Sequence, residues 1–317
     1  MVKLISVTGH TSLDYLLTVE KIIGPNQSSP ILKCETNFGG GAANVAAGMA
    51  KLGGAVQLIS PVGDDFVSSE YEKHLSELGV DLSRLYRMEN EQLSKAFVIT
   101  DRFSNQSTYF YWGAAGKLSS LEPPNVDFVH MSTADCFFNA KISESAGFVS
   151  FDPGQDLVTY KKEPLQTILK NTNLLFANRH EIKMVCDISG YTFEELKNMI
   201  DVIVVTYDKE GSILYSCGNV GFDGENIKIG QRREKTEIKI PPVLVQSVDP
   251  TGAGDAYKAG FLVAFTKGYS LPVCGKIGAV TASFVVEKIG CQTNLPDWVA
   301  MEKRYKEHFL ESELVLK

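Results

Sequence analysis

The chain has 317 residues, 44% of them apolar and 22% charged, so it is long enough to bury a substantial core. Its 31 lysines and arginines face 38 aspartates and glutamates, which gives a formal net charge of −7. An acidic chain without a strong basic cluster is a poor ligand for nucleic acid, so we expect no nucleic-acid partner. No apolar run approaches the ~20 residues that cross a bilayer, and we expect no membrane association.

Six cysteines are scattered along the sequence, without a C-x-x-C pair or a histidine at metal-ligand spacing. This pattern argues against a zinc site and against a dense disulfide framework. We therefore expect reduced, partly buried thiols and a cytoplasmic protein.

Short apolar runs rich in β-branched residues recur along the chain and predict buried strands. They lie at 4–9, 56–60, 128–132, 148–152, 174–178 and 201–206. Helical patterns stand between or after them, at 42–53, 68–79, 191–200 and 278–290, and Thr192 and Glu195 form a capping-box pattern. Such an alternation is typical of a doubly wound α/β fold with a mainly parallel sheet.

Two segments, 12–36 and 92–115, have a different, antiparallel character. The second has two β-rich runs around "SNQS", which predicts a hairpin with a longer loop. Strands inserted between α/β units often form a lid over a site at the carboxyl edge of the sheet. We therefore expect one domain over 1–317 with a small β-sheet lid.

The stretch "FGGGAANVAAGMAKLG" (38–53) brings three consecutive glycines into an apolar helix. A dinucleotide-binding fingerprint would place a further glycine where Asn44 stands, which disfavours that interpretation. A flexible turn explains the glycines but not Asn44, because a polar amide in so apolar a helix needs a partner.

The stretch "VDPTGAGDAYKAGF" (248–261) has two interpretations. In one, Asp255 is a helix N-cap or first-turn acid, favoured by the helix dipole. In the other, Gly252, Ala253 and Gly254 form an anion cradle and Asp255 is a catalytic base beside it. This stretch alone leaves both open.

Two further motifs, "NRHE" (178–181) and "VVTYDKEG" (204–211), follow apolar strands, where loops line a ligand crevice. Asn178 and Glu181 are three residues apart, a spacing that suits water-mediated contact with Mg²⁺ and phosphate. Alternatively, Asn178 caps the following helix and Glu181 completes a capping box.

These motifs, in this order within one α/β chain, resemble the ribokinase-like (phosphofructokinase B type) family of carbohydrate and nucleoside kinases. The resemblance extends from "VTGH" to "CQTNLP", and "DPTGAGD" is a specific signature of that family. The stretches "GHTSLDY", "NQSTYFYWGAA", "FDPGQDL" and "GCQTNLP" are similar to the archaeal-type broad-specificity nucleoside kinases within it.

The resemblance implies roles for residues on the acceptor side. The amides of Gly252, Ala253, Gly254 and Asp255 would hold the transferring phosphoryl group, and Asp255 would accept the proton of the acceptor hydroxyl. Asp14 would bind ribose hydroxyls in a pocket with Gly40, Gly41 and Asn44; as an alternative, Asp14 is a turn acid after a strand.

The uncharged, aromatic lid segment 104–115 suits a planar, uncharged base rather than a sugar phosphate. Candidate base contacts are Asn26, Gln106, Tyr109 and Gln155. Alternation puts Tyr109 and Tyr111 on one face and Phe110 and Trp112 on the other, where they can pack the lid or a dimer interface.

On the donor side, the resemblance implies that Asn178 and Thr206 bind the ATP phosphates and that Glu181 contacts Mg²⁺ through water. Further candidate residues are Asp208, Gly211, Ala282 and Val286 for the nucleotide, and Asp249 and Thr251 for a monovalent cation such as K⁺. Many relatives have glycine where Asp208 stands, and this acid requires Lys209 or the metal to offset it. The choice between ATP and another triphosphate stays open.

The sequence thus predicts an ATP- and Mg²⁺-dependent kinase for the 5′-hydroxyl of a purine or pyrimidine nucleoside, and a homodimer formed through the lids. One alternative is a sugar or sugar-phosphate kinase on the same fold. Another is a non-catalytic nucleoside sensor that kept the pocket.

Overall fold

The computed structural model describes residues 3–103, 105–217, 220–222, 227–229 and 235–309. Its main sheet has eight strands in the order β16-β13-β12-β11-β10-β9-β1-β4. The six strands from β4 to β12 are parallel, and β13 and β16 extend that sheet in antiparallel pairing. Their bounds are β1 (Ile5–Thr8), β4 (Val56–Ile59), β9 (Phe128–Met131), β10 (Phe148–Phe151), β11 (Leu174–Asn178), β12 (Val202–Thr206), β13 (Ser212–Ser216) and β16 (Thr236–Ile240).

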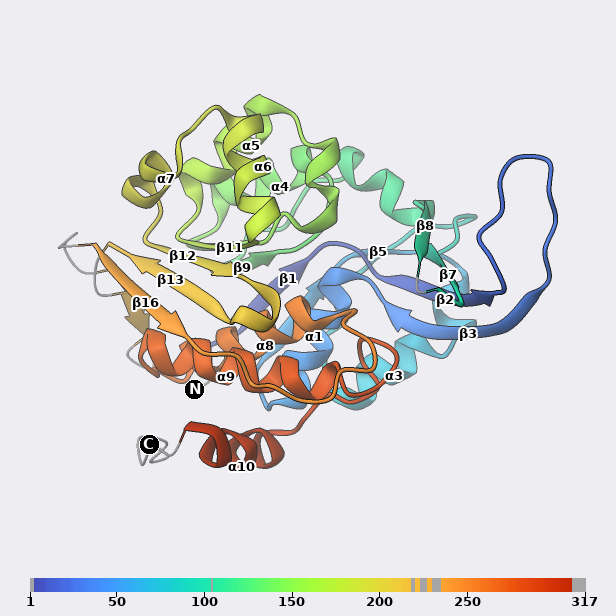
Figure 1. Cartoon of the computed structure of the whole chain (residues 1–317). Helices are drawn as coiled ribbons and strands as arrows, with labels where there is room; N and C mark the ends of the chain where they lie inside the picture. The colour runs from blue at the N-terminus through green and yellow to red at the C-terminus, as the bar shows by residue number, and fades with distance from the viewer. Residues whose placement is uncertain (1–2, 104, 218–219, 223–226, 230–234, 310–317) are drawn as a thin grey trace.

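Helices cover both faces of the main sheet (Figure 1). One face packs against α1 (Gly41–Lys51), α3 (Tyr71–Leu78), α8 (Ala253–Thr266), α9 (Leu271–Val285) and α10 (Trp298–Phe309). The other packs against α4 (Cys136–Ser145), α5 (Lys162–Asn171), α6 (Arg179–Ser189) and α7 (Phe193–Met199). All the predicted strands of this sheet are present, so the prediction of a doubly wound α/β fold is confirmed.

The predicted capping box of α7 is present, with the Thr192 hydroxyl accepting the Glu195 N–H. The helix expected over 68–79 is wrong at its start. A short helix, α2 (Asp65–Ser68), ends there, and Glu70 has a left-handed backbone (φ 65°) before α3 begins. Gly79 ends α3 as predicted. At the other end of the chain, α9 stops at Val285 rather than continuing to 290.

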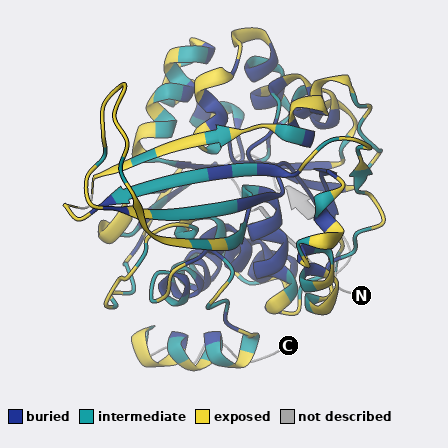
Figure 2. Cartoon of the chain, turned by 90° about the vertical axis from the view of Figure 1, so that its right-hand side faces the viewer, coloured by how far each residue is buried: buried dark blue, intermediate teal, exposed yellow. Residues whose placement is uncertain are grey.

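The lid is a four-stranded sheet in the order β3-β2-β7-β8, with β2 (Ser12–Val19), β3 (Ile31–Gly39), β7 (Ser94–Asp101) and β8 (Gln106–Tyr111). The expectation of an antiparallel lid holds only for its outer pairs. β2 and β7 run parallel, because both leave the body of the molecule in the same direction. The lid strands are less buried than those of the main sheet (Figure 2). The predicted hairpin is present; of its "SNQS" loop, Ser104 lies outside the described residues.

The strand order places a switch point at β1, because the chain continues to β4 on one side and to β9 on the other. The crossover from β1 to β4 contains α1, and the connections from β9 to β12 use α4, α5, α6 and α7 on the opposite face. In open α/β sheets, ligands bind beyond the carboxyl ends of the strands at such a point. The lid strand β2 begins four residues after β1 ends, so the lid stands beside this position.

Two expectations from composition can be compared with the structure. All six cysteines are free thiols; Cys34 is exposed and the others are buried or half-buried. Within the described ranges, no helix has both the length and the apolar character needed to span a bilayer.

Candidate active site

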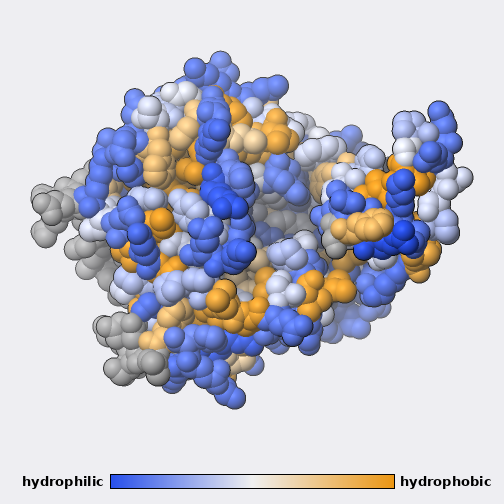
Figure 3. Space-filling view, viewed as in Figure 1, coloured by the Kyte–Doolittle hydropathy of each residue, from blue (hydrophilic) through white to orange (hydrophobic). Residues whose placement is uncertain are grey.

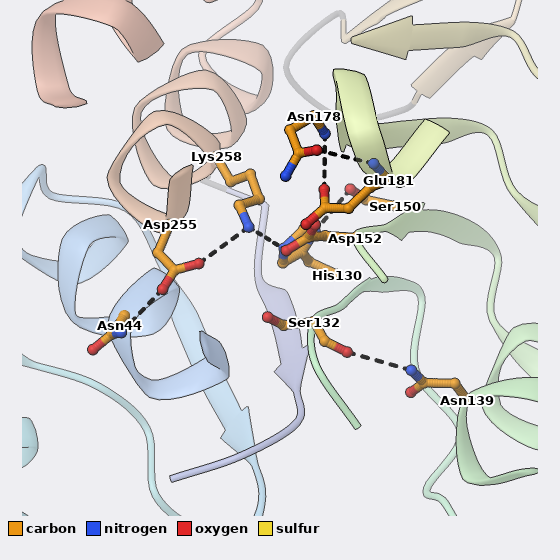
Figure 4. Close-up of polar contacts among 10 residues, drawn as sticks. All are labelled: Asn44, His130, Ser132, Asn139, Ser150, Asp152, Asn178, Glu181, Asp255 and Lys258. Carbon is orange, nitrogen blue, oxygen red and sulfur yellow. Dashed lines mark hydrogen bonds and ion pairs between the residues drawn. The ribbon is translucent and has the colours of Figure 1, made fainter. Parts of the chain in front are cut away.

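Asp255 lies in the first turn of α8, and its carboxylate is held from two sides (Figure 4). Oδ2 accepts a hydrogen bond from the Asn44 amide at 3.0 Å, and Oδ1 accepts one from the Lys258 ammonium at 3.1 Å. No side chain caps the start of α8, so the N-cap interpretation of Asp255 is wrong and the first-turn position is right. The carboxylate thus bonds to side chains of α1 and α8 and does not cap the backbone of its own helix.

The turn before α8 has the properties of an anion cradle. Gly252 is left-handed (φ 82°), and a Cβ at this position would overlap Cys291, so only glycine fits. The Ala253 N–H donates to the carbonyl of Pro250 at 3.2 Å. Among the described residues, the N–H groups of Gly254 and Asp255 have no protein acceptor. These two amides, at the positive end of a 14-residue helix, can bind an anion.

Asn44 has the partners that its place in an apolar helix requires. Its side chain is buried in α1, where Nδ2 donates to Asp255 and Oδ1 accepts from the Gln292 amide at 2.9 Å. Gln292 in turn contacts the Tyr71 hydroxyl at 2.6 Å. The sequence analysis did not predict Gln292 or Tyr71 as site residues, although Gln292 lies in the quoted stretch "GCQTNLP".

A buried ion-pair cluster continues from Asp255. Lys258, one turn further along α8, donates to Asp255 and to Asp152, which follows β10. Burial by itself would lower the pKa of the Lys258 ammonium, but the charges of Asp152 and Asp255 outweigh it and raise that pKa. Lys258 therefore remains a cation inside the site. Neither Lys258 nor Asp152 was a predicted site residue.

Asp14 is the third residue of β2 rather than a turn acid, so that alternative is wrong. Its carboxylate lies against Gly39, where any side chain would overlap it, and it accepts a hydrogen bond from the Ser12 hydroxyl at 2.9 Å. Burial raises the pKa of Asp14 to about 6, although the Ser12 hydrogen bond lowers it; the negative charge of Asp255 adds to the rise. Asp14 and Asp255 therefore share one electrostatic environment.

Gly40 and Gly41 bring the start of α1 close to the ends of two strands of the main sheet. Gly40 is left-handed (φ 96°), and a side chain there would overlap the backbone of His10 and Ser12. A side chain at Gly41 would overlap the hydroxyl of Thr133, which follows β9. The two glycines thus let the start of α1 pack against the residues that follow β1 and β9, and Asn44 lies three residues further along this helix.

The strand register decides which lid side chains face the site. Asp14 pairs with Ala96, and Ala96 pairs with Phe110, so these residues share the inner face. The rings of Phe110 and Trp112 lie 5.7 Å and 5.5 Å from the His10 ring. Tyr109 belongs to the opposite face and is 66% exposed, so the structure does not bring it to the site. Phe110 and Trp112 occupy the place expected of Tyr109.

The other candidate base contacts are scattered. Gln106 is on the inner face but four residues along β8 from Phe110, which is roughly 13 Å at the usual rise of a strand. Asn26 is exposed in the loop between β2 and β3, which projects away from the body (Figure 1). Gln155 is exposed beside Asp156, whose carboxylate is 2.5 Å from His10 Nε2. The buried His10–Asp156 pair was missed, although the two residues lie in the quoted stretches "GHTSLDY" and "FDPGQDL".

The donor residues gather at the ends of β11 and β12, where Asn178 pairs with Thr206. The alternative interpretation of "NRHE" is confirmed: Asn178 Oδ1 accepts the Glu181 N–H, and Glu181 Oε2 accepts the Asn178 N–H, in a capping box. This arrangement leaves the Asn178 amide nitrogen and the second Glu181 oxygen available. Burial, together with the negative charge of Asp152, raises the pKa of Glu181 to about 7.

The negative charge of Asp208 is balanced by a different cation from the one that the sequence suggested. Arg179, not Lys209, lies 3.4 Å from the Asp208 carboxylate and 3.6 Å from that of Glu210. Asp208 has a left-handed backbone (φ 51°), a conformation that favours glycine. Gly211 is also left-handed (φ 93°) and closes this turn against Ile240.

The remaining predicted residues lie around the loop before the cradle. The carbonyl of Val286, at the end of α9, accepts the N–H groups of Val248 at 2.7 Å and Asp249 at 3.2 Å. Ala282 is half-buried on α9. The Asp249 carboxylate accepts the N–H groups of Thr251 at 2.9 Å and Gly290 at 3.3 Å. Within the described part of the chain, no three acidic, histidine or cysteine side chains cluster tightly enough to hold a metal by themselves.

An anion cradle with an adjacent carboxylate, at the switch point of a doubly wound sheet, defines a phosphotransferase site. Comparison with known proteins agrees. The model of the pfkB family of carbohydrate kinases matches residues 2–298. A nucleoside kinase from Methanocaldococcus jannaschii is 43% identical over 96% of this chain and 97% of its own length. One from Methanothermobacter thermautotrophicus is 38% identical over 94% of both chains.

A crystal structure of the M. jannaschii nucleoside kinase, described as an archaeal member of the ribokinase family, is also similar. It superimposes with a TM-score of 0.86 over 97% of this chain and 99% of that chain, at 42% identity. The chain therefore belongs to the pfkB family of carbohydrate kinases. It is a phosphotransferase that uses an alcohol group as acceptor, as the sequence predicted.

Proposed function

We propose that this protein is a nucleoside kinase that transfers the γ-phosphoryl group of ATP to the 5′-hydroxyl of a nucleoside. One observation carries the proposal: the Asp255 carboxylate, fixed by Asn44 and Lys258, stands beside the two unpaired amides of the cradle. The cradle suits a phosphoryl group, and the carboxylate suits the hydroxyl that attacks it. The names of the two archaeal relatives support a nucleoside as the acceptor.

In this step the acceptor hydroxyl oxygen forms a bond to the γ-phosphorus, and the bond from that phosphorus to the bridging oxygen breaks. ADP leaves with the electron pair of the broken bond, and the hydroxyl proton passes to Asp255. Phosphoryl transfer depends mainly on positioning and on stabilisation of charge. The hydrogen bonds from Asn44 and Lys258 would position Asp255. The amides of Gly254 and Asp255 would stabilise the charge of the phosphoryl group.

The acceptor pocket suits an uncharged, planar group. Asp14 and Asn44 would bind the ribose hydroxyls, and Phe110 and Trp112 offer aromatic surface on the inner face of the lid. The cations near the lid hairpin are engaged elsewhere: Arg102 pairs with Glu20, and Lys95 lies 3.4 Å from Asp65. This distribution favours a nucleoside over a sugar phosphate, whose phosphate would require a free cation.

On the donor side, we propose that Asn178 and Thr206 bind the ATP phosphates, with Gly211, Ala282 and Val286 near the nucleotide. Magnesium fits this end of the site. Asp152 is buried and Glu181 is half-buried, and burial together with the negative charge of Asp152 raises the pKa of Glu181, a rise that a bound cation would offset. Mg²⁺ commonly keeps several waters, so Glu181 would hold it through its water shell, where it would neutralise phosphate charge.

A monovalent cation such as K⁺ fits the loop that carries Asp249 and Thr251. Both carboxylate oxygens of Asp249 accept a backbone N–H, and each retains a lone pair for a cation. The loop leads directly into the cradle, so an ion bound there would stabilise the turn that presents the amides. Turnover in K⁺ compared with tetramethylammonium tests this role.

We further propose that two copies of the chain pair through their lids in the cytoplasm. Apolar residues are visible on the lid (Figure 3). The large side chains of Ile31, Leu32, Phe103, Tyr109 and Tyr111 in this region are each at least 45% exposed. An exposed apolar sheet invites pairing with another copy. The six free thiols suit a reducing compartment. Light scattering of the wild type against Tyr109→Glu would measure the dimer.

The proposed function is tested by coupled ADP release with ATP and Mg²⁺ across nucleosides, ribose and fructose 6-phosphate, with Asp255→Asn as the site control. We expect turnover with several nucleosides and little with free sugars. Preference for a sugar or sugar phosphate would overturn the nucleoside assignment. Tight nucleoside binding without turnover of any acceptor would identify a sensor instead.

A further inference from the structure

Lys258 is the buried cation of the active site. Its side chain is 10% exposed, and it lies one turn after Asp255 on the same face of α8. An ammonium has three N–H donors, and two of them go to Asp152 and to Asp255. Burial of an ammonium is costly unless it is paired, so this position requires both carboxylates.

The ammonium also lies beside the cradle. A Cβ built on Gly254 would be 3.9 Å from Lys258 Nζ, so the cation borders the turn whose amides are unpaired. The positive charge of Lys258 therefore lies within hydrogen-bond distance of the Asp255 carboxylate and close to Gly254 of the cradle. Figure 4 shows the side chain directed from α8 toward Asp152 and Asp255.

The carboxylates around this point would repel one another without the cation. Burial raises the pKa of Asp14, and the negative charge of Asp255 raises it further. Burial likewise raises the pKa of Glu181, and the negative charge of Asp152 adds to that rise. The charge of Lys258 acts in the opposite direction on Glu181 and on Asp152. Loss of Lys258 would leave Asp255 free to turn away from its neighbours, with only the Asn44 hydrogen bond to hold it.

We propose that Lys258 is a positioning residue for phosphoryl transfer, anchored by Asp152 and holding Asp255 in the orientation that receives the acceptor proton. This inference rests on the role of Asp255 in the proposed function, not on the identity of the acceptor. If the role of Lys258 were purely structural, Lys258 would serve only to neutralise the buried charge of Asp152. The two roles separate once Asp152 is made neutral.

The experiment compares Lys258→Met, Asp152→Asn and the double variant with the wild type. Steady-state kcat and KM and the melting temperature are measured with whichever acceptor the wild type turns over best. Lys267→Met, at the other end of α8 and stacked on Trp298, controls for loss of a lysine from this helix. A sugar as the best acceptor would overturn the nucleoside assignment while the test of Lys258 proceeds unchanged.

We expect Lys258→Met to lower kcat by about 10²-fold, the cost of a misplaced catalytic group, with KM changed less than about threefold. Asp152→Asn keeps the bond from Lys258 to Asp255, so its kcat is the reference against which the double variant is compared. The double variant removes both buried charges and should recover the melting temperature while kcat stays about 10²-fold below Asp152→Asn.

Two results would overturn the inference. One is a double variant whose kcat equals that of Asp152→Asn, because Lys258 would then contribute nothing beyond neutralising Asp152. The other is Lys258→Met with the kcat of the wild type. If Lys258→Met alone fails to fold, the comparison of Asp152→Asn with the double variant still decides, since neither contains an unpaired buried carboxylate from this ion pair.

Discussion

The acceptor and donor ends of the site differ in how their polar groups are held. Around Asp255, buried side chains from α1, α8 and the segment after β10 bond to one another across the fold. Near Thr206 at the ends of β11 and β12, Glu181 bonds to the backbone of Asn178 three residues away. Asp208 and Glu210 are well exposed and pair with Arg179. The proposed proton acceptor is thus preorganised, whereas the proposed nucleotide end is more exposed, which suits a ligand that must exchange in every cycle.

The difference predicts that substitutions at the acceptor end act on turnover. Asp255→Asn keeps the shape of the side chain and an oxygen that can accept the hydrogen bond from Asn44, but it removes the proposed proton acceptor. We expect kcat to fall by about 10²–10⁴-fold, and the free energy of unfolding to fall as well because Lys258 loses one of its two charged partners. Asp127→Asn, an exposed carboxylate beside Lys3, is the matched control. A variant that loses stability but keeps kcat would contradict the role of Asp255.

At the donor end, substitution of Glu181 separates charge from capping. Glu181→Gln retains the capping box, because glutamine can accept the same N–H, and removes the negative charge near the proposed Mg²⁺. We expect the Mg²⁺ concentration for half-maximal turnover to rise about tenfold or more, as for other outer contacts to metals. Glu195→Gln makes the same change in the capping box of α7 and should have no effect.

The shared electrostatics of Asp14 and Asp255 predict a pH dependence of nucleoside binding. The pKa of Asp14 is raised to about 6, so its carboxylate is mostly protonated below that pH and ionised above it. An ionised carboxylate accepts more hydrogen bonds from the ribose, so affinity should increase by up to about tenfold between pH 5 and pH 7. Calorimetric titration of the wild type against Asp14→Asn measures it; an equally steep change in the variant would exclude Asp14 as the cause.

The sign for stability is opposite. Because the pKa of Asp14 in the folded protein exceeds its ordinary value of 3.8, the folded protein binds this proton more tightly than the unfolded chain. The contribution of Asp14 to the free energy of unfolding therefore falls as the pH rises from about 4 to about 6. Denaturant titrations of the wild type and Asp14→Asn across this window would show the difference.

The smallest effect is expected at the exposed ion pairs of Arg179. Arg179→Ala frees Asp208 and Glu210 and should change the KM for ATP by less than about fivefold, because an exposed pair contributes about 1 kcal/mol or less. Asp208→Gly relieves the left-handed backbone and should be equally mild. A large loss of ATP affinity in Arg179→Ala would show instead that Arg179 binds the phosphates directly.

Several local features could be predicted from the sequence because their causes are local. The apolar runs of the parallel strands, the capping box of α7 and the Gly stop of α3 each depend on residues a few positions apart. The motif around Asp255 likewise identified the cradle, since a glycine-rich turn before a helix exposes amides by its own backbone geometry. Local chemistry did not show that α3 begins only after Glu70.

Partners that are distant in the sequence required the tertiary structure. Lys258 lies three residues from Asp255, yet its significance comes from Asp152, which is 106 positions away and is brought there by β10. Alternation divided the lid aromatics between two faces correctly, but only the pairing of β2, β7 and β8 shows that Phe110 shares the face of Asp14. The sequence by itself determined the class of fold and the cradle, because these follow from local pattern and backbone geometry. Which charges surround Asp255, and which face of the lid covers them, was decided by strand order and register.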